Sequence, residues 1–291
     1  VVGLKPYQIM ALTFTNKAAR EMKERIAQMV GPEKAQYLAM GTFHAQFSKL
    51  LRTESAHIGL PSNFTVYDTA DAKNLIKAIV KEMQLDEKTY KPSVVLSRIS
   101  SAKNKMVMPQ QYDDANGRSL DFMMRIPKVK EIYTEYQRRL KQAGAMDFDD
   151  MLCLTNQLFI QHPEVLEKYQ NRFQYILVDE YQDTNYAQYL LLKALAAKHR
   201  RICVVGDDSQ SIYAFRGADI SNILYFQKQY PESKLFKLEQ NYRSTKYLVE
   251  AANSLIAHNK GRIPKKVFSE NEVGDPLQLS EAYSDIEEAN M

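Results

Sequence analysis

Two acidic residues at the end of an apolar segment are the first residues that could do chemistry. Ile176-Leu-Val-Asp179-Glu180 places both carboxylates directly after a run typical of a buried strand. In open α/β sheets, ligands bind at the carboxyl ends of the strands. There an aspartate can hold Mg²⁺ on a nucleotide while a neighbouring glutamate accepts a proton from the attacking water. Taken alone, the pair also fits a solvated strand end.

A second apolar segment ends in a polar loop that is richer in functional groups. Cys203-Val-Val-Gly206 runs into Asp-Asp-Ser-Gln210 and then into Tyr213, Phe215 and Arg216. Gln210 could sense a terminal phosphate and Arg216 could stabilise charge, while the two aromatic rings could stack on bases. The alternative for the aromatic pair is a place in the hydrophobic core.

A third polar segment, Glu239-Gln-Asn-Tyr242-Arg243-Ser-Thr245, joins a predicted strand to a predicted helix. Its arginine could reach across a domain boundary, as an arginine finger does. As an isolated tetrapeptide, Asn-Tyr-Arg-Ser does not identify a function.

The elements that must position these groups follow the alternation of a parallel α/β sheet. Helices are predicted from apolar residues spaced three and four apart, and the first of them ends at Gly31-Pro32. The expected helices cover residues 16–30, 41–51, 186–197 and 246–257. The expected strands cover residues 8–14, 37–40, 173–178, 202–205 and 235–238.

Between residues 61 and 172 the pattern changes to successive helices with no convincing strand. Residues 128–143 show it best, because their apolar side chains fall on one helical stripe. We therefore expect an α/β domain interrupted by an all-helical insertion. The stripe contains Val129, Ile132, Tyr133, Tyr136 and Leu140.

The insertion also contains a basic run. Between Arg98 and Ala145 there are ten basic and five acidic residues, an excess larger than the net charge of +4 of the whole chain. Such a run fits a surface that binds a polyanion. It fits a solvated helical face at least as well.

Length and composition exclude several classes of protein. With 291 residues, of which 45% are hydrophobic and 25% charged, the chain can form one large or two ordinary globular domains and is not disordered. Its apolar runs are far shorter than the roughly 20 residues that span a bilayer, and we expect no signal peptide. Cys153 and Cys203 lack metal-ligand spacing, which indicates a reducing compartment.

Six motifs in order resemble the motif series of the UvrD/PcrA-type superfamily 1 DNA helicases. Any one of them could arise by chance, but six in the same order and spacing are specific. The resemblance implies a RecA-like P-loop NTPase-type parallel sheet interrupted by a helical subdomain. The motifs are Ala11–Met22, Gly41–His44, Asp147–Asp150, Asp179–Thr184, Gly206–Ala218 and Gln240–Thr245.

The resemblance also implies the roles of individual residues in an ATP site. Asp179 would hold Mg²⁺ and Glu180 would activate water. Gln210 and Arg243 would contact the γ-phosphate. Tyr242 would stack on adenine.

For single-stranded DNA, the resemblance implies a track lined by aromatic and polar side chains. Arg216 would couple this track to the nucleotide site. Relatives usually carry tryptophan at the position of Phe215, and this chain contains no tryptophan, so the expected stacking surface is smaller but still aromatic. The track residues are Phe14, Thr42, His44, Tyr213 and Phe215.

The Gly-rich phosphate-binding loop of the family is missing from the sequence. A P-loop needs glycines five apart before Lys and Ser or Thr, and no two of the ten glycines have that spacing. In the family this loop lies upstream of the Phe14 motif, and further motifs lie downstream of Met291. We therefore expect a central fragment, inactive alone. Its expected parts are a first motor domain (1–60 and 173–239), the insertion (61–172) and the beginning of a second motor domain (240–291).

The expected function is that of a bacterial ATP-dependent 3′–5′ DNA helicase, which couples ATP hydrolysis to movement on single-stranded DNA and duplex unwinding. The expected cofactors are ATP and Mg²⁺. The expected partners are single-stranded DNA, single/double-strand junctions, and repair or replication proteins, in the cytoplasm at the nucleoid and without a membrane. Three alternatives stay open: a subunit of a helicase–nuclease complex, a non-catalytic DNA-binding or scaffolding module, and a nuclease with Asp179, Glu180 and Asp183 as metal ligands.

Overall fold

The computed structural model describes residues 3–113 and 117–290. Its contacts divide the chain into two compact units, Val1–Ile223 and Leu224–Met291. No helix in the described part of the chain is long and apolar enough to cross a membrane.

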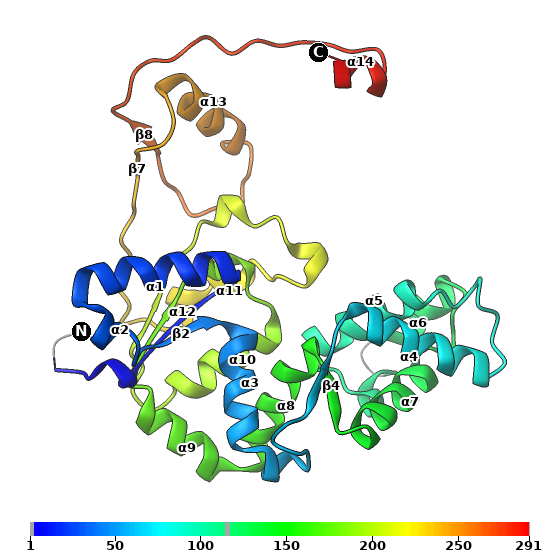
Figure 1. Cartoon of the computed structure of the whole chain (residues 1–291). Helices are drawn as coiled ribbons and strands as arrows, with labels where there is room; N and C mark the ends of the chain where they lie inside the picture. The colour runs from blue at the N-terminus through cyan, green and yellow to red at the C-terminus, as the bar shows by residue number, and fades with distance from the viewer. Residues whose placement is uncertain (1–2, 114–116, 291) are drawn as a thin grey trace. The chain divides into compact units, whose positions relative to one another are not determined.

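A four-stranded parallel sheet forms the centre of the first unit (Figure 1). The strand order is β2-β1-β5-β6, so β1 and β5 are central and β2 and β6 lie at the edges. These strands confirm the four predicted before residue 206, although β2 begins two residues later than expected. They are β1 (Ile9–Thr13), β2 (Ala39–Thr42), β5 (Tyr175–Val178) and β6 (Ile202–Val204).

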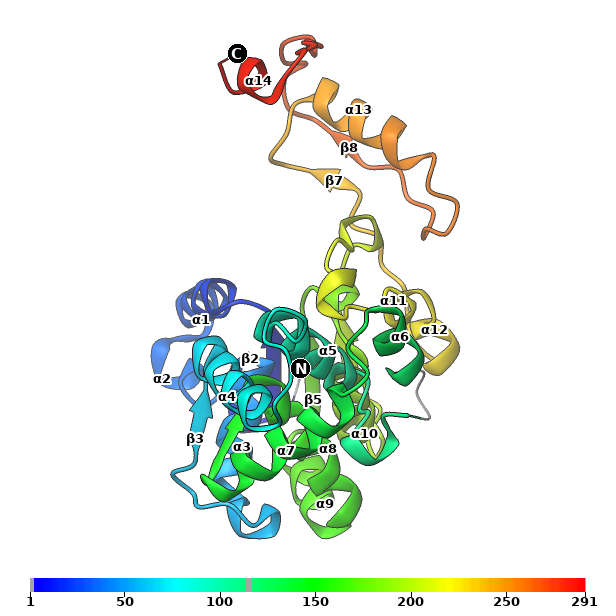
Figure 2. The ribbon, with the colours of Figure 1, turned by 90° about the vertical axis from the view of Figure 1, so that its right-hand side faces the viewer.

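Helices cover the sheet, as expected for parallel strands joined by crossovers. Figure 2 shows α1 and α2 to the left of β5 and α10 to its right. The helix α1 begins where the Thr15 hydroxyl accepts a hydrogen bond from the Ala18 N–H at 3.1 Å, and it ends at Gly31, whose φ is 89°. The helices around the sheet are α1 (Asn16–Val30), α2 (Pro32–Ala35), α3 (Phe43–Thr53), α8 (Phe148–Gln161), α9 (Pro163–Arg172), α10 (Tyr186–Ala196) and α11 (Ser221–Leu224).

Short 3₁₀ helices occupy several connections between these elements. Most of them stand at a strand end or a helix end, where the chain turns. They are η1 (Pro6–Gln8), η2 (Ser55–Ile58), η3 (Pro109–Gln111), η4 (Tyr181–Asp183), η5 (Asp208–Gln210) and η6 (Ala214–Arg216).

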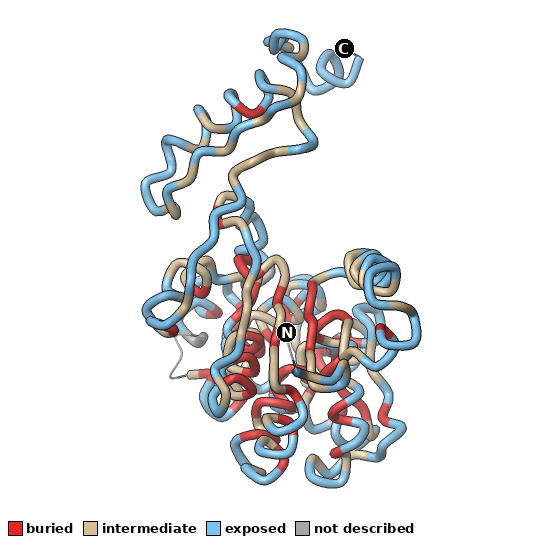
Figure 3. The backbone as a smooth tube through the Cα atoms, turned by 90° about the vertical axis from the view of Figure 1, so that its left-hand side faces the viewer, coloured by how far each residue is buried: buried red, intermediate tan, exposed pale blue. Residues whose placement is uncertain are grey.

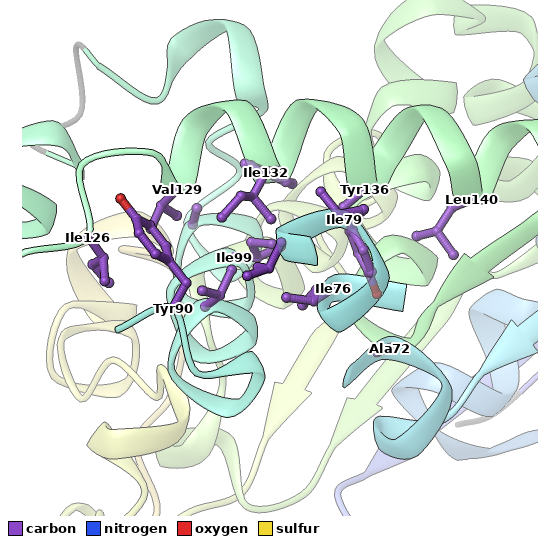
Figure 4. Close-up of a cluster of buried hydrophobic side chains, with 14 of the residues drawn as sticks. Ala72, Ile76, Ile79, Tyr90, Ile99, Ile126, Val129, Ile132, Tyr136 and Leu140 are labelled. Carbon is purple, nitrogen blue, oxygen red and sulfur yellow. The ribbon is translucent and has the colours of Figure 1, made fainter. Parts of the chain in front are cut away.

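The predicted helical insertion is a block with its own hydrophobic core (Figure 4). The five residues of the predicted α7 stripe are all buried, which confirms that stripe. They pack against Ile76 and Ile79 of α4 and Ile99 of α5. The helices of the block are α4 (Thr69–Glu82), α5 (Pro92–Asn104), α6 (Gly117–Met123) and α7 (Val129–Gln142).

The expectation of an all-helical insertion was wrong in one respect. Two strands, β3 (Thr65–Tyr67) and β4 (Ala145–Asp147), pair in parallel where the chain enters and leaves the block. Each strand has only three residues, and a run of three is too short to show the alternation by which strands are recognised. Their pairing joins the two ends of the block.

A buried lysine connects the block to α8. Lys103 of α5 is fully buried, and its Nζ lies 2.7 Å from Asp147 Oδ2 and 2.8 Å from Asp150 Oδ1. The Tyr136 hydroxyl donates to the same Asp147 oxygen at 2.9 Å. Burial acts to lower the pKa of Lys103, but the two carboxylates outweigh it and hold the pKa well above its ordinary value. Burial, followed by the charge of Asp147, raises the pKa of Asp150 to about 6.

The second unit has little hydrophobic core. Figure 3 shows its chain mostly exposed, and Tyr230 and Val249 are its buried apolar side chains among those described. The strand expected at residues 235–238 was wrong: Leu235, Phe236 and Leu238 are exposed and belong to no strand. The elements are α12 (Phe226–Gln229), β7 (Gln240–Asn241), α13 (Lys246–Ile256), β8 (Phe268–Ser269) and α14 (Asp285–Asn290).

The three-part domain division stays a prediction. α8 and α9 fall inside the predicted insertion, yet α8 packs against α3 and α10 beside the sheet as well as against α5. By its contacts, α8 therefore links the sheet to the helical block.

Candidate active site

The carboxyl ends of the parallel strands bring several predicted site residues to one edge of the sheet. Phe14 follows β1, Thr42 ends β2, and Asp179 follows β5. Gly206 lies in the loop after β6. This edge is where open α/β sheets bind ligands.

Glu180 has a strained backbone in the turn after β5. Its φ is 53°, a left-handed conformation that costs a non-glycine residue roughly 1 kcal/mol. The turn is held because the Tyr181 N–H donates to the Val205 carbonyl at 2.9 Å and the Asp183 N–H donates to the Glu180 carbonyl at 2.9 Å. Asp179 Oδ1 accepts from the Glu180 N–H at 3.0 Å. Both predicted carboxylates are therefore half-buried and fixed at the sheet edge.

Gln182 is a site residue that the sequence analysis did not single out. Its buried side chain donates through Nε2 to Glu180 Oε2 at 2.8 Å and accepts through Oε1 from the Asp207 N–H at 3.0 Å. A Cβ at Gly206 would lie 2.5 Å from that Oε1, which explains the glycine there. Gln182 thus connects the Glu180 carboxylate to the loop after β6.

Replacing Gln182 by leucine is expected to lower the free energy of unfolding by about 1–3 kcal/mol, because the Asp207 N–H loses its partner in a buried turn. Urea unfolding measures this. Gln142→Leu, at the exposed end of α7, is the matched control and should be nearly neutral. Equal stability of the two variants would contradict the role of Gln182.

Gln210 lies on the same hydrogen-bonded path. Its Nε2 donates to Asp207 Oδ2 at 2.9 Å, while Asp207 Oδ1 accepts from the Ser209 N–H at 2.9 Å. The Asp207 N–H donates to Gln182, which in turn donates to Glu180. A chain of hydrogen bonds therefore connects Glu180 to Gln210 through Gln182 and Asp207. The structure therefore brings these two predicted catalytic residues into one network, with Gln210 at its exposed end.

Asp183 follows in the same turn. Burial, and then the negative charge of Glu180, raises the pKa of its carboxyl group above the ordinary value. Its Oδ1 is buried without a hydrogen-bond partner among the described residues. Carboxylate oxygens are the ligands that Mg²⁺ prefers, and a nucleotide-bound Mg²⁺ needs only one or two of them beside its waters, so the half-buried Asp179 carboxylate at this edge suits such an ion.

The aromatic pair after Gln210 lies on the surface. Phe215 is 79% exposed and Tyr213 is 37% exposed, with ring centroids 5.9 Å apart. The alternative that these rings belong to the hydrophobic core is wrong. The side chain of Arg216, the predicted coupling residue, lies outside the described part of the structure.

The other predicted DNA-track residues of this unit lie around the start of α3. Thr42 is nearly buried, and its hydroxyl caps α3 by accepting from the Ala45 N–H at 3.3 Å. The Phe14 and Phe43 rings pack with their centroids 5.7 Å apart. The centroids of the His44 and Phe148 rings are 5.2 Å apart. Burial lowers the pKa of His44 below its ordinary value. At neutral pH His44 is therefore a neutral ring.

Tyr242 and Arg243 belong to the second unit, between β7 and α13. Tyr242 is 78% exposed, and its hydroxyl donates to Gln240 Oε1 at 2.9 Å. The Asn241 side chain accepts from the backbone N–H groups of Arg243 and Ser244 at 2.9 and 2.8 Å. This turn presents both predicted nucleotide-binding side chains to solvent.

The basic run of the insertion is partly paired. Acidic side chains lie within ion-pair distance of six of its ten basic residues, while Lys105, Arg125 and Lys141 are exposed. The paired residues are Arg98, Lys103, Lys128, Lys130, Arg138 and Arg139.

This sheet and its acidic edge are consistent with a RecA-like domain. The UvrD/REP helicase N-terminal domain family matches residues 2–231, and the UvrD-like helicase C-terminal domain family matches residues 236–291. The chain therefore belongs to the UvrD/REP helicase family.

Two curated relatives show how much of such a helicase the chain covers. ATP-dependent DNA helicase PcrA of Staphylococcus epidermidis is 48% identical over 286 residues, which are 98% of this chain and 38% of that helicase. ATP-dependent DNA helicase PcrA of Staphylococcus aureus is 47% identical over 286 residues, with the same coverage of each chain. The chain thus spans 38% of the length of the curated relatives it matches.

Proposed function

We propose that this chain is part of an ATP-dependent DNA helicase that moves 3′ to 5′ on single-stranded DNA and unwinds duplexes. The observation that supports it best is the hydrogen-bonded path from Glu180 through Gln182 and Asp207 to Gln210. The exposed rings of Tyr213 and Phe215 follow on the same loop. A change at Gln210, the phosphate-sensing end of this path, could therefore reach Tyr213 through the two residues that separate them.

In this proposal, each acidic or polar group of the site has one task. Asp179 holds Mg²⁺, which neutralises charge on the terminal phosphates. Glu180 accepts the proton of the attacking water, and its left-handed backbone and its bond to Gln182 fix the carboxylate for that task. Gln210 and Arg243 contact the γ-phosphate, and Tyr242 stacks on adenine.

On the DNA side, the proposal assigns the stacking of bases to Tyr213 and Phe215, and the remaining track contacts to Phe14, Thr42 and His44. Arg216 would couple the track to the nucleotide. We also propose the three-part division at residues 60, 172 and 239. Single/double-strand junctions, repair or replication partners and a cytoplasmic, nucleoid-associated location belong to the same proposal.

The experiment for the catalytic assignment uses the complete helicase that contains this chain. Glu180→Gln should lower ATP turnover about 10²- to 10⁴-fold, because it removes the general base. Binding of single-stranded DNA should persist. Glu87→Gln, a substitution of an exposed residue between α4 and α5, is the control and should leave turnover unchanged. A Glu180→Gln helicase with normal turnover would overturn the assignment.

The 291-residue chain alone should not hydrolyse ATP, because its sequence has no P-loop glycine spacing and so lacks the lysine that neutralises the β- and γ-phosphates. Magnesium-dependent release of phosphate measures this. Turnover by the purified chain that Glu180→Gln abolishes would contradict the prediction. Cleavage of DNA that Asp183→Asn abolishes would instead support the nuclease alternative.

A further inference from the structure

A cluster of two histidines and one glutamate lies away from the acidic edge of the sheet. One potential metal-ligating atom from each of His57, His162 and Glu164 lies within 4.8 Å of the other two. His57 stands in η2 after α3, and His162 joins α8 to α9. Figures 1 and 2 both place α9 at the lower end of the first unit. The helix α3 starts at the carboxyl end of β2 and runs back toward the amino ends of the parallel strands before η2, so the cluster lies on the side of the sheet opposite Asp179.

Two of these groups are already close enough to be ligands of one ion. His162 Nδ1 and Glu164 Oε1 form a hydrogen bond of 3.1 Å, and an ion would take the place of its proton. Ligands of a tetrahedral Zn²⁺ ion with bonds of about 2.0–2.1 Å stand about 3.4 Å apart. The third group is close, because the His57 and His162 ring centroids are 4.7 Å apart and meet edge to face. Small rotations of partly exposed side chains would bring all three to one ion.

A buried carboxylate lies beside the remaining histidine. Glu54 Oε2 is 3.6 Å from His57 Nδ1, which is ion-pair range and longer than a hydrogen bond. A metal-binding imidazole commonly has a carboxylate on its other nitrogen, which fixes the ring and raises its basicity.

The same carboxylate holds the two ligand-bearing segments together. Glu54 Oε1 accepts from Lys168 Nζ at 2.6 Å and from the Tyr169 hydroxyl at 2.9 Å, and both donors stand on α9. Pro163 at the first turn of α9 restricts the backbone next to His162. The backbone positions of the ligands are thus set before any ion binds, which lowers the cost of assembling a site.

We propose that His57, His162 and Glu164 bind a divalent transition-metal ion of the Zn²⁺ class. Imidazole nitrogens suit Zn²⁺ and its neighbours, and two histidines with one carboxylate leave a fourth position for water. Bound there, the ion cross-links η2 to the start of α9. The site is separate from the proposed Mg²⁺ position at Asp179 in location and in ligand chemistry.

The test is titration of the purified 291-residue chain with CoCl₂ and ZnCl₂. One equivalent of Co²⁺ should give visible absorption bands, Zn²⁺ should displace it, and either metal should raise the melting temperature. His57→Gln and His162→Gln should each weaken binding about tenfold or more. Glu164→Gln should also weaken binding, and it alters an exposed side chain.

The control is His258→Gln, which removes an exposed histidine of the second unit. It should leave metal binding unchanged. The metal-free melting temperature of each variant shows that it is folded. Absence of Co²⁺ binding by the unsubstituted chain at sub-millimolar metal would overturn the proposal. So would unchanged affinity in both the His57→Gln and the His162→Gln variants.

Discussion

Replacement of Lys103 by methionine is expected to lower the free energy of unfolding of the first unit by about 3–5 kcal/mol, because it leaves buried carboxylates without their cation. Asp147 and Asp150 both lie within 2.8 Å of the Lys103 ammonium group. Methionine fills a similar volume, so the loss measures charge rather than packing. Urea or guanidinium unfolding, followed by circular dichroism, gives the free-energy difference.

Two further variants isolate the cause of that loss. Lys105→Met, two residues along at the exposed end of α5, should be nearly neutral. Combining Lys103→Met with Asp147→Asn and Asp150→Asn should recover much of the stability, since no buried charge then lacks a partner. A Lys103→Met chain as stable as the Lys105→Met chain would show that the three charges do not hold α5 to α8.

The sequence predicts those parts of the fold that repeat a pattern over many residues. The α7 stripe extends over twelve residues, so its period of three and four residues is clear, and the structure buries all five of its members. β3 and β4 have three residues each, and only their pairing with each other makes them strands. In the second unit, the apolar run at Leu235 suggested a strand, but it has no partner strand to pair with among the described residues.

The candidate site was predictable in its residue types but not in its connections. Asp179, Glu180 and Gln210 stood out because each follows an apolar strand segment. The contacts of Gln182 could not be predicted, because its partner Asp207 lies 25 residues away in the sequence. The same holds for Lys103, whose partner Asp147 lies 44 residues away. Such pairs carry no local signal, since only the folded chain brings them together.

Phe215→Ala is expected to weaken binding of single-stranded DNA by about 1–3 kcal/mol, or roughly 5- to 150-fold in the dissociation constant, because a base loses its stacking partner. Tyr213→Ala should act in the same direction. Stability should hardly change, because Phe215 is 79% exposed and loses little buried area on truncation. A buried phenylalanine would instead cost about 3–5 kcal/mol of stability. Titration with a fluorescent oligonucleotide and thermal melting of the same preparation measure both quantities.

Phe236→Ala provides the matched control, because Phe236 is also 79% exposed and lies outside the predicted DNA track. It removes the same ring without removing the proposed stack, so it should leave the dissociation constant unchanged. In the complete helicase, Phe215→Ala should also reduce the distance moved per ATP hydrolysed, since the ring follows Gln210 by only five residues. If the Phe215→Ala variant binds and moves on DNA as well as the Phe236→Ala variant does, the aromatic pair is not a stacking surface. The hydrogen-bonded path from Glu180 to Gln210 would then not act on DNA through these two rings.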